Sequence, residues 1–486
     1  MIALTLTEVA RATAGRVVAP DGVDPDRVVV DGPVVTDSRE AGPGSLYVAR
    51  VGEQADGHDF VAAAAQRGAV AALVARPVED LPGVVVDDTE VAFGLLAREV
   101  VARVPGLEVV GITGSSGKTS TKDLLGAVLA TVGPTVAPVG SYNSEIGVPL
   151  TVCRVTADTR FLVVEMGARG IGHVAHLARV APPRVGVVLN VGTAHVGEFG
   201  SRDAIARAKS ELVAALPADG LAVLNADDAA VRAMAAATIA RVVLVGEADD
   251  ADLRATDVVL DAGGRPTFTV ETAAGRRSLT LGLVGRHHVG NALAVLAVAL
   301  ELGMPFERAC AALESARAAS RWRMEVTERD DGVTVVNDAY NANPDSMRAA
   351  LTALERMGEG RRTWAVLGTM LELGDESAAL HVEVGAEVVA HGVDELLVVG
   401  AAAAPLADGA RAATPATAGD GTASAAGDGT ASARATRTRL VPDADAAEAL
   451  LREELRPGDV VLFKSSRDAG LRLLGDRLAG PREELT

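Results

Sequence analysis

Cysteine is almost absent from this chain, since only Cys153 and Cys310 occur among its 486 residues. Two cysteines cannot build the disulfide framework of a small secreted fold, and their scarcity is typical of a reducing compartment. The N-terminal residues lack the basic start and continuous apolar run of a signal peptide, and no apolar stretch is long and pure enough to span a bilayer. We therefore expect a soluble, cytoplasmic protein without stable membrane insertion.

Positive charge is also in deficit. The chain has 46 lysine and arginine residues against 65 aspartate and glutamate residues, a formal net charge of −19 at pH 7. Most of such a surface repels a nucleic-acid backbone, so we expect no nucleic-acid partner. An anionic small-molecule substrate would need local positive sites.

Lysine is scarcer still, with only Lys118, Lys122, Lys209 and Lys464 in the whole chain. Arginine supplies nearly all of the generic positive charge. Each remaining lysine is therefore a candidate for a position where only a compact, modifiable primary amine serves. For Lys122 the alternative, a residual lysine on a solvated helix face, stays open.

Aromatic residues make up 2% of the chain whereas 49% of its residues are hydrophobic, so its cores must consist mainly of alanine, valine and leucine. The length predicts about three domains. Short apolar runs that alternate with helical stretches predict an α/β fold. We expect a small N-terminal α/β domain over 1–105, a central domain with a mostly parallel sheet over 106–318, and a Rossmann-like domain over 319–486.

A duplicated tract interrupts the third predicted domain, with AGDGTAS at 418–424 and again at 426–432. Small polar repeats of this kind supply too little apolar surface for a core. We expect a disordered surface insert over about 408–436.

A glycine-rich loop, GSSGKT at 114–119, stands between a predicted strand and a predicted helix. The strict phosphate-binding loop has glycine five positions before its Gly-Lys pair, where this chain has Ile112. In this setting backbone amides and the helix N-terminus can still cradle phosphates, while a lysine neutralises them and a threonine reaches Mg²⁺. We predict nucleotide binding by Gly114, Ser115, Ser116, Gly117, Lys118 and Thr119.

Two further polar residues follow central strands. Glu165 ends the predicted strand FLVVE, and His195 comes just after the strand RVGVVLN. The carboxyl ends of parallel strands meet at the edge where such sheets bind ligands. A carboxylate and a neutral imidazole can bind a divalent ion, although Mg²⁺ prefers oxygen. We predict a shared metal role, while a structural role for either residue alone stays open.

Lys209 occupies an unusual position, because Ile205, Lys209, Leu212 and Leu216 recur at helical spacing on one apolar stripe. A buried unpaired ammonium is costly. The site must pair this lysine, lower its pKa or modify it, for example to a carbamate that binds Mg²⁺. The alternative is a side chain that extends past the stripe to solvent.

The third predicted domain adds charged groups near its strand ends. Asp338 ends the strand VTVVN, Lys464 follows the strand DVVLF, and Arg321 and Arg323 precede the domain. A nucleotide held by the central domain would meet these groups only if the third domain folds over it, which would also exclude water.

Together these motifs resemble the Mur ligase superfamily, ATP-dependent amide-forming enzymes of peptidoglycan assembly, over all three predicted domains. The loop is similar to the Gly-Thr-x-Gly-Lys-Thr form of that family, with Ser115 in place of threonine, and this explains its spacing. The runs NDAYNANPDSM and VLGTMLELGDES most resemble the branch that joins D-alanyl-D-alanine to a UDP-N-acetylmuramoyl-tripeptide.

The resemblance extends to segments that contact substrate and nucleotide in the family. TDSREAGPGSLYVARVGEQADGHDF resembles a uridine-nucleotide segment, SYNSEIGVPLT a muramoyl-peptide segment, GRHHVGNALA a segment near adenine, and FKSSRDAGL a Lys-Gly-Ser-Arg segment. The residues carried over are Ser38, Arg39, Asn143 and Lys464 for substrate, and Asn291 for adenine. Three positions depart from the family pattern: His288, Thr369 and Ser465.

The resemblance implies a two-step reaction in a monomer. ATP phosphorylates the tripeptide carboxylate, and the amine of D-alanyl-D-alanine then displaces phosphate from the acyl phosphate. Asp338 would hold the ATP ribose and Arg323 its phosphates. Two Mg²⁺ ions would be served by Thr119, Glu165, His195 and a carbamylated Lys209. The residues implied in catalysis are Lys118, Lys209, His195 and Glu165.

Three alternatives remain at this level. Another ligase of the superfamily, such as a tripeptide-forming enzyme or a folate polyglutamate synthetase, has related motifs, although the folate enzyme lacks such a uridine-binding domain. A phosphate-loop phosphotransferase or GTPase is disfavoured by the loop spacing and by Lys209. A non-catalytic homologue is expected to have lost one of the residues implied in catalysis, and all of them are present.

Overall fold

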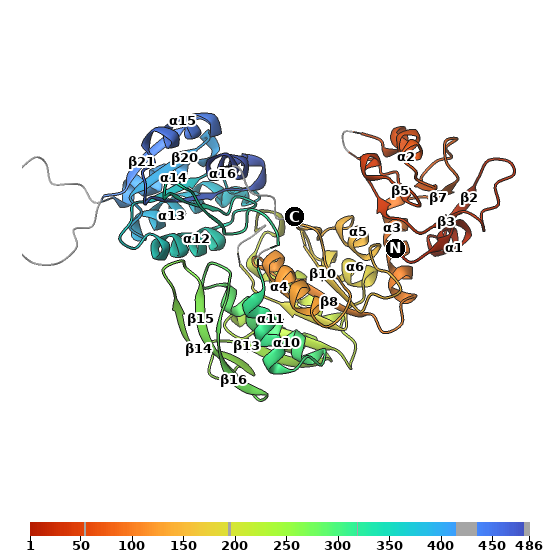
Figure 1. Cartoon of the computed structure of the whole chain (residues 1–486), viewed down its shortest axis with the longest axis horizontal. Coiled ribbons are helices and arrows are strands. Elements are labelled where there is room, and N and C mark those ends of the chain that lie inside the picture. Colours follow the sequence, from red (N-terminus) through yellow and green to blue (C-terminus); the bar gives the residue numbers. More distant parts are fainter. Residues whose placement is uncertain (53–54, 193–195, 318, 415–434, 481–486) are drawn as a thin grey trace, which may run out of the picture.

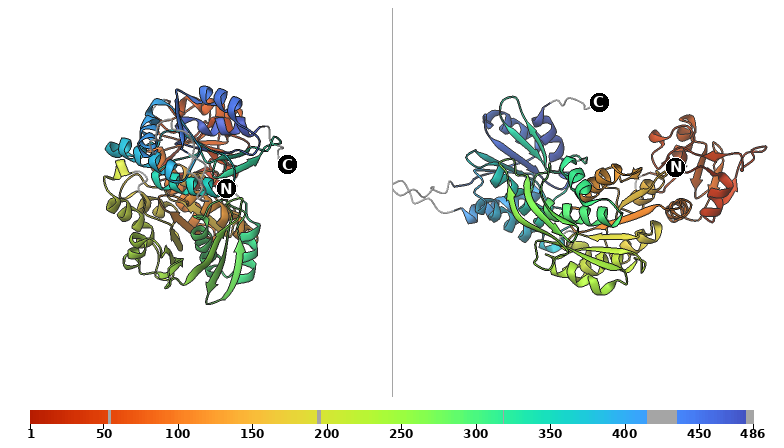
Figure 2. Two further views of the ribbon diagram at one scale, coloured as in Figure 1. Left: turned by 90° about the vertical axis from the view of Figure 1, so that its left-hand side faces the viewer. Right: turned by 60° about the horizontal axis from the view of Figure 1, so that its bottom comes forward.

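The computed structural model describes residues 1–486 except 53–54, 193–195, 318, 415–434 and 481–486. Three α/β bodies follow one another along the chain, with the N-terminal and C-terminal bodies at opposite ends of a central one (Figure 1). The right-hand view of Figure 2 shows the same order from another direction. The α/β fold class that the sequence predicts is confirmed, whereas the boundaries proposed near residues 105 and 318 stay a prediction.

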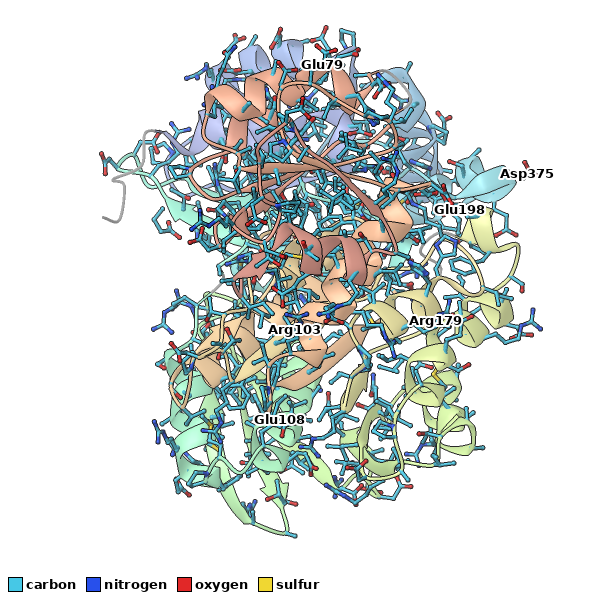
Figure 3. All side chains as sticks on the ribbon, turned by 90° about the vertical axis from the view of Figure 1, so that its right-hand side faces the viewer. Glu79, Arg103, Glu108, Arg179, Glu198 and Asp375 are labelled. Atoms are coloured by element: carbon cyan, nitrogen blue, oxygen red, sulfur yellow. The ribbon has the colours of Figure 1, made fainter. Side chains whose placement is uncertain are left out.

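The N-terminal body contains a sheet in the strand order β2-β7-β6-β5-β4, in which neighbours are parallel except for β2. Its elements are β1 Leu4–Thr5, α1 Leu6–Ala12, β2 Arg16–Val18, β3 Val29–Val30, β4 Val34–Val35, β5 Leu46–Val48, α2 Val61–Gln66, β6 Ala71–Val74, β7 Gly83–Val85 and α3 Thr89–Ala102. Helix α3 joins this body to the central one, because Arg98 Nη1 donates a hydrogen bond of 2.6 Å to the carbonyl oxygen of Arg179, whose position Figure 3 labels.

The central body is organised by a long sheet whose order, over the described residues, is β16-β15-β14-β13-β12-β11-β8-β10-β9. Strand β15 is antiparallel to both of its neighbours, and all other neighbouring pairs are parallel. Its strands are β8 Glu108–Thr113, β9 Thr135–Val136, β10 Phe161–Glu165, β11 Val185–Val188, β12 Leu221–Asn225, β13 Arg241–Gly246, β14 Leu253–Leu260, β15 Pro266–Thr272 and β16 Gly275–Thr280. Its helices are α4 Lys118–Ala130, α5 Gly147–Val152, α6 His173–Val180, α7 Val196–Phe199, α8 Arg202–Ala214, α9 Ala229–Ala233, α10 His288–Glu301 and α11 Phe306–Ser315.

Alternation along the central strands builds two cores, one on each face of the sheet. In β10, Leu162 and Val164 belong to the core on the side of α6 and α8, while Phe161 and Val163 belong to the core on the side of α4 and α10. Successive side chains of a strand point to opposite faces, so a strand covered on both faces is apolar throughout. The sheet is therefore rigid where its strands end, which is where the polar residues begin.

The C-terminal body repeats this design on a sheet that has, in the described part of the chain, the order β17-β18-β22-β19-β20-β21, with only β17 antiparallel. Its elements are β17 Glu325–Glu328, β18 Thr334–Asn337, α12 Pro344–Met357, β19 Thr363–Leu367, α13 Ser377–Ala390, β20 Glu395–Val399, α14 Ala404–Ala413, β21 Arg437–Val441, α15 Ala444–Glu454, β22 Val460–Lys464 and α16 Leu471–Ala479. Helices α12, α13 and α14 pack on one face, and α15 and α16 on the other.

The prediction of a disordered insert over about 408–436 is wrong at both ends of that range. Helix α14 continues to Ala413, and Thr436 is buried, with its hydroxyl donating to the carbonyl oxygen of Val393 at 2.7 Å. The alanine-rich sequence of α14 allows this helix to approach α13 closely, and the packing of the two helices stabilises the segment. The duplicated tract itself lies outside the described residues.

The central and C-terminal bodies also touch beyond the chain linker that joins them. A Cβ atom added to Gly197 of α7 would lie 2.4 Å from the backbone nitrogen of Gly374, so the two backbones are in direct contact. Figure 3 labels their neighbours Glu198 and Asp375 on the same side of the molecule. Within the described residues, no helix combines the length and the apolar character needed to cross a bilayer.

The close approach of α13 and α14 generates a stability prediction. A Cβ added to Gly409 would lie 1.9 Å from the carbonyl oxygen of Val382, so the Gly409→Ala substitution must separate the helices and should lower the free energy of unfolding by about 2 kcal/mol or more. Chemical denaturation measures this difference. The helical Gly290 is the matched control, because its added methyl group would meet no atom within 4 Å; equal stability of both variants would contradict the packing argument.

Candidate active site

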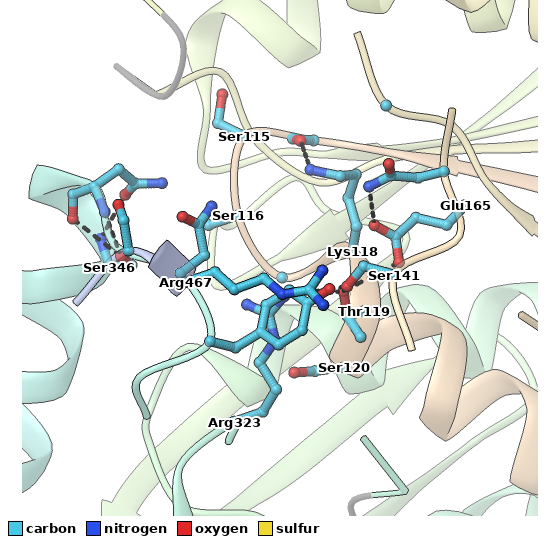
Figure 4. A pocket seen from close by; sticks show the side chains of 18 of the residues that line it. Ser115, Ser116, Lys118, Thr119, Ser120, Ser141, Glu165, Arg323, Ser346 and Arg467 are labelled. Atoms are coloured by element: carbon cyan, nitrogen blue, oxygen red, sulfur yellow. Dashed lines mark hydrogen bonds between the residues drawn. The ribbon is translucent and has the colours of Figure 1, made fainter. Parts of the chain in front are cut away.

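One cavity of about 750 Å³ receives residues from all three bodies. Arg50 and Glu90 reach it from the N-terminal body, the loop 114–119 from the central body, and Arg323 from the start of the C-terminal body. Figure 4 shows the loop side chains facing Arg323 and Arg467 across this space. The predicted folding of the third domain over the glycine-rich loop is therefore present in the structure.

The glycine-rich loop joins the end of β8 to the start of α4, as the sequence predicts. Gly117 precedes the helix with φ +81°, a left-handed conformation that favours glycine. Asn190, which follows β11, holds the loop: its carbonyl oxygen accepts from Ser115 N at 3.1 Å and its Oδ1 accepts from Ser116 N at 2.9 Å. Sequence reasoning missed Asn190, although its place just after a central strand was a usable signal.

Lys118 is the first residue of α4 and lines the cavity. Its Nζ donates to the carbonyl oxygen of Gly114 at 2.7 Å, so the side chain folds back along the loop (Figure 4). Burial lowers the pKa of Lys118, the nearby Glu165 opposes this shift, and Arg323 adds to it. A phosphate bound in the loop would restore the missing negative charge and stabilise the ammonium form.

Thr119 and Glu165 meet at the carboxyl edge of the sheet. The Thr119 hydroxyl donates to Glu165 Oε2 at 3.1 Å, and Asn143 Nδ2 donates to Glu165 Oε1 at 2.8 Å. The hydroxyl of Ser141 lies 3.0 Å from that of Thr119. This confirms the predicted placement of Glu165 beside the loop, and it adds Ser141, which the sequence reasoning missed although it belongs to the same SYNSEIGVPLT run as Asn143.

The donor atoms at this point fit Mg²⁺ in chemical type, because hydroxyl and carboxylate oxygens are its preferred protein ligands. Among the described residues, no group of three or more histidine, cysteine, aspartate or glutamate side chains could hold a metal. Glu165 is therefore the carboxylate that the described residues offer beside the Thr119 hydroxyl. His195, the other predicted ligand, lies outside the described residues.

Lys209 lies on α8 between the buried Ile205 and Leu212 and reaches the same cavity. It is only 5% exposed, so the alternative of a side chain that extends to solvent is wrong. Burial lowers its pKa well below the ordinary value, and the charge of Lys118 lowers it further. No hydrogen bond or ion pair links its ammonium group to any residue that the structure describes. This shift favours the neutral, nucleophilic amine over the ammonium form.

Asp338 directly follows β18, Lys464 ends the neighbouring strand β22, and the two form a buried ion pair of 2.5 Å. Lys464 Nζ also donates to the carbonyl oxygen of Asn341 at 3.1 Å, and Asp338 Oδ1 accepts from Met324 N at 3.0 Å. Burial lowers the pKa of Lys464, and Asp338 opposes this shift. Both line the cavity, so a ligand there would meet the pair together.

Arg323 reaches from the start of the C-terminal body to the glycine-rich loop. Its Nη2 lies 3.4 Å from Thr119 Oγ1 and 3.3 Å from Ser141 Oγ. Its guanidinium carbon lies 4.3 Å from the ring centre of Tyr340, and that of Arg467 lies 5.7 Å from the same centre. The Nε atom of Arg323 is buried without a hydrogen-bond partner in the described structure. Tyr340, a residue of the NDAYNANP run that the sequence reasoning missed, thus places two cations beside the loop.

Asn291 lies behind the loop, where a Cβ added to Gly117 would be 2.9 Å from Asn291 Oδ1. It also lines a second cavity of about 400 Å³ that includes Asn190 and Arg286. His288, one of the positions that depart from the family pattern, is buried, and its Nδ1 lies 3.3 Å from Asn291 Nδ2. Burial lowers the pKa of His288 well below the ordinary value. A neutral imidazole therefore supports the amide.

The predicted substrate residues fall into two groups. Asn143 and Lys464 line the large cavity. Ser38 and Arg39 are not among its described lining residues; Ser38 is buried, while Arg39 is exposed and pairs with Asp37 at 2.6 Å. Thr369 and Ser465 stand behind Lys464, where the carbonyl oxygen of Thr369 accepts from Ser466 N at 3.0 Å.

The three bodies and the shared cavity define a modular ATP-dependent ligase of known type, and family models agree with this. The Mur ligase family, catalytic domain, matches residues 33–110, the Mur ligase middle domain matches 112–299, and the Mur ligase, glutamate ligase domain, matches 322–467. The chain belongs to the Mur ligase family.

Within that family, one set of relatives covers almost the whole chain. The UDP-N-acetylmuramoyl-tripeptide–D-alanyl-D-alanine ligase of Mycobacterium tuberculosis is 48% identical over 98% of each chain. A crystal structure of MurF from Acinetobacter baumannii superposes with a TM-score of 0.85 at 30% identity over 99% of each chain. MurF from Thermotoga maritima, in complex with ADP, has a TM-score of 0.77 at 28% identity and covers 93% of this chain and 97% of its own.

Lys209, buried and without a hydrogen bond or ion pair to the described residues, generates a prediction about stability and pH. Its folded pKa lies well below the ordinary value of 10.5, so the unfolded chain binds more protons and stability rises with pH up to that value. The Lys209→Met substitution removes the penalty and should stabilise the protein by about 1–3 kcal/mol at neutral pH. The gain should shrink as the pH approaches 10.5.

Urea denaturation in carbonate-free buffer at several pH values measures this difference. The control is Arg207→Met, which changes an exposed cation on the same helix and should leave the pH dependence unaltered. A destabilised Lys209→Met protein at neutral pH would show that Lys209 gains more from unseen partners than it loses by burial.

Proposed function

We propose that this protein is the ATP-dependent ligase that joins D-alanyl-D-alanine to UDP-N-acetylmuramoyl-tripeptide, forming the pentapeptide precursor of peptidoglycan with release of ADP and phosphate. One observation carries the choice of substrates: the relative that bears this activity in its name is 48% identical over 98% of both chains. The geometry independently supports nucleotide chemistry, because the loop, the Thr119–Glu165 pair and two buried lysines line one cavity.

The glycine-rich loop holds the ATP phosphates in this proposal. The backbone amides of 114–117 and the Lys118 ammonium bind β and γ oxygens, and Arg323 adds a second cation from across the cavity. Asp338 accepts a hydrogen bond from the ribose, and Asn291 contacts adenine. The support is that Lys118, Arg323 and Asp338 line the same cavity while Asn291 lies against Gly117.

Two Mg²⁺ ions would be held by Thr119, Glu165, His195 and a carbamylated Lys209. Their chemistry is to neutralise the transferring phosphoryl group and so favour in-line attack by the substrate carboxylate. Asn143 fixes the Glu165 carboxylate through its 2.8 Å hydrogen bond. The neutral amine of Lys209 is the form that adds CO₂ with loss of a proton, and the resulting carbamate would offer the oxygen ligands that Mg²⁺ prefers.

The substrates then meet in the closed cavity. Ser38 and Arg39 bind the uridine nucleotide, and Asn143 supports the muramoyl peptide. Lys464, beside Asp338, assists D-alanyl-D-alanine, whose amine attacks the acyl phosphate; the tetrahedral intermediate expels phosphate and loses a proton from nitrogen. Cations around the cavity stabilise the anionic charge of both steps, and the enclosing C-terminal body excludes water from the acyl phosphate. We further infer a monomer that works in the cytoplasm.

The reaction is tested with purified protein, ATP, Mg²⁺, D-alanyl-D-alanine and UDP-muramoyl tripeptide containing either diaminopimelate or lysine. We expect phosphate release that requires both the tripeptide and the dipeptide, and a pentapeptide product by mass spectrometry. Phosphate release that does not depend on the dipeptide, or the absence of product with either tripeptide, would refute the assignment.

The carbamate is tested with the Lys209→Ala variant. We expect activity to fall by about 100-fold or more, because a metal ligand is lost, and to recover in part with millimolar acetate or propionate, whose carboxylate can enter the vacated space. The control is Arg207→Ala, at an exposed position of the same helix. This variant should keep its activity, and added carboxylate should not alter it. Full activity of Lys209→Ala without added carboxylate would show that no carbamate is needed.

A further inference from the structure

Lys122 is the one lysine of the chain that lies outside the residues lining the large cavity, and yet it is 2% exposed. It stands one turn beyond Lys118 on α4. Its ammonium group makes three contacts: an ion pair with Asp123, a hydrogen bond of 2.8 Å to the carbonyl oxygen of Pro138, and one of 3.2 Å to Ser320 Oγ. The alternative of a residual lysine on a solvated face is therefore wrong.

These contacts tie together three segments that are far apart in sequence. Pro138 begins the loop that carries Ser141, and Ser320 belongs to the linker that carries Arg323. Asp123, on the same helix as the lysine, binds the linker a second time, because its Oδ2 accepts from Ser320 N at 2.9 Å. Lys122 thus joins the helix of the phosphate loop to both neighbouring segments at once.

The other ends of these segments meet again at Thr119. The Ser141 hydroxyl lies 3.0 Å from Thr119 Oγ1, and Arg323 Nη2 lies 3.4 Å from the same atom and 3.3 Å from Ser141 Oγ. Figure 4 shows Thr119, Ser141 and Arg323 together beside Lys118. The position of Lys122 therefore sets where two side chains stand relative to the phosphate loop.

The linker needs such an anchor because its backbone is strained. Trp322 and Met324, on either side of Arg323, have φ values of +58° and +48°, which are costly for large side chains. Two hydrogen bonds attach the strained segment to the C-terminal body: Trp322 Nε1 donates to Asp476 at 3.0 Å, and Met324 N donates to Asp338. Ser320, through Lys122 and Asp123 of α4, attaches the same segment to the central body.

The chemistry of the contacts explains why arginine has not replaced this lysine. A tetrahedral ammonium has three hydrogens, which matches the three acceptors around this buried group. A planar guanidinium is larger and directs its hydrogens into one plane, so it cannot satisfy the same three acceptors from the same place.

We propose that Lys122 is a positioning residue for the phosphoryl-transfer site: through Pro138 and Ser320 it holds Ser141 and Arg323 at Thr119, where they act on the ATP phosphates. This inference rests on the proposed function for its assay, but it concerns nucleotide binding and is independent of which substrates are joined.

The test compares Lys122→Met, Lys122→Arg and the milder Ser320→Ala in the full chain. We expect Lys122→Met to lower kcat/KM for ATP by about 10- to 100-fold, with KM for the tripeptide and the dipeptide unchanged. Lys122→Arg should not restore it, and Ser320→Ala should show a smaller effect of the same kind. In an Arg323→Ala background, Lys122→Met should have less than about a twofold further effect, because both changes remove the same alignment.

The matched control is Arg184→Met, which breaks contacts to Glu108 and Glu301 at the opposite edge of the same sheet and should leave KM for ATP unchanged even if stability falls. Wild-type ATP parameters in Lys122→Arg, or effects of Lys122→Met and Arg323→Ala that simply multiply, would overturn the proposal. Calorimetric binding of a non-hydrolysable ATP analogue separates a failure of this proposal from a failure of the proposed function. If the wild-type protein makes no pentapeptide but binds the analogue more tightly than Lys122→Met does, only the proposed function is refuted.

Discussion

The parallel register of β8 with β10 and β11 governs the geometry of the site. Glu165 pairs with Ile112, and Val188 pairs with Thr113, so the three strands end side by side. Because the interiors of the three strands are apolar on both faces, polar side chains that can meet a ligand gather at this carboxyl edge. The phosphate loop, Glu165 and Asn190 are neighbours for that reason, and Asn190 holds the loop through its hydrogen bonds with Ser115 N and Ser116 N.

A second property of the site is that three of the four lysines of the chain line it. Lys209 and Lys464 are buried and Lys118 is partly buried, and burial lowers the pKa of each. Of the three, Lys464 alone has a carboxylate of the described residues in direct contact. In a chain with a net charge of −19, such a site attracts anions locally while the rest of the surface repels them. Bound phosphates would supply the missing countercharge, so ligand binding and closure of the bodies support one another.

Periodicity and strand-end positions were sufficient to predict much of this site. The α/β architecture, the placement of Glu165 beside Thr119 and the burial of Lys209 follow from patterns within single segments. The contacts that Asn190, Ser141 and Tyr340 make were not predictable in this way, because each lies in a loop whose path depends on other segments. The extent of the insert was also misjudged, since close packing between α13 and α14 extends the ordered region.

The sequence by itself therefore determined which chemical groups exist and on which helix or strand end each one stands. It also singled out lysine through its rarity, since an amine remains where arginine cannot serve. Only the tertiary structure decided which of these groups meet: Lys464 with Asp338, Arg323 with Thr119, and Lys122 with Pro138 and Ser320. The physical reason is that such contacts join segments more than a hundred residues apart or loops without periodicity, and their distances depend on how whole sheets and helices pack.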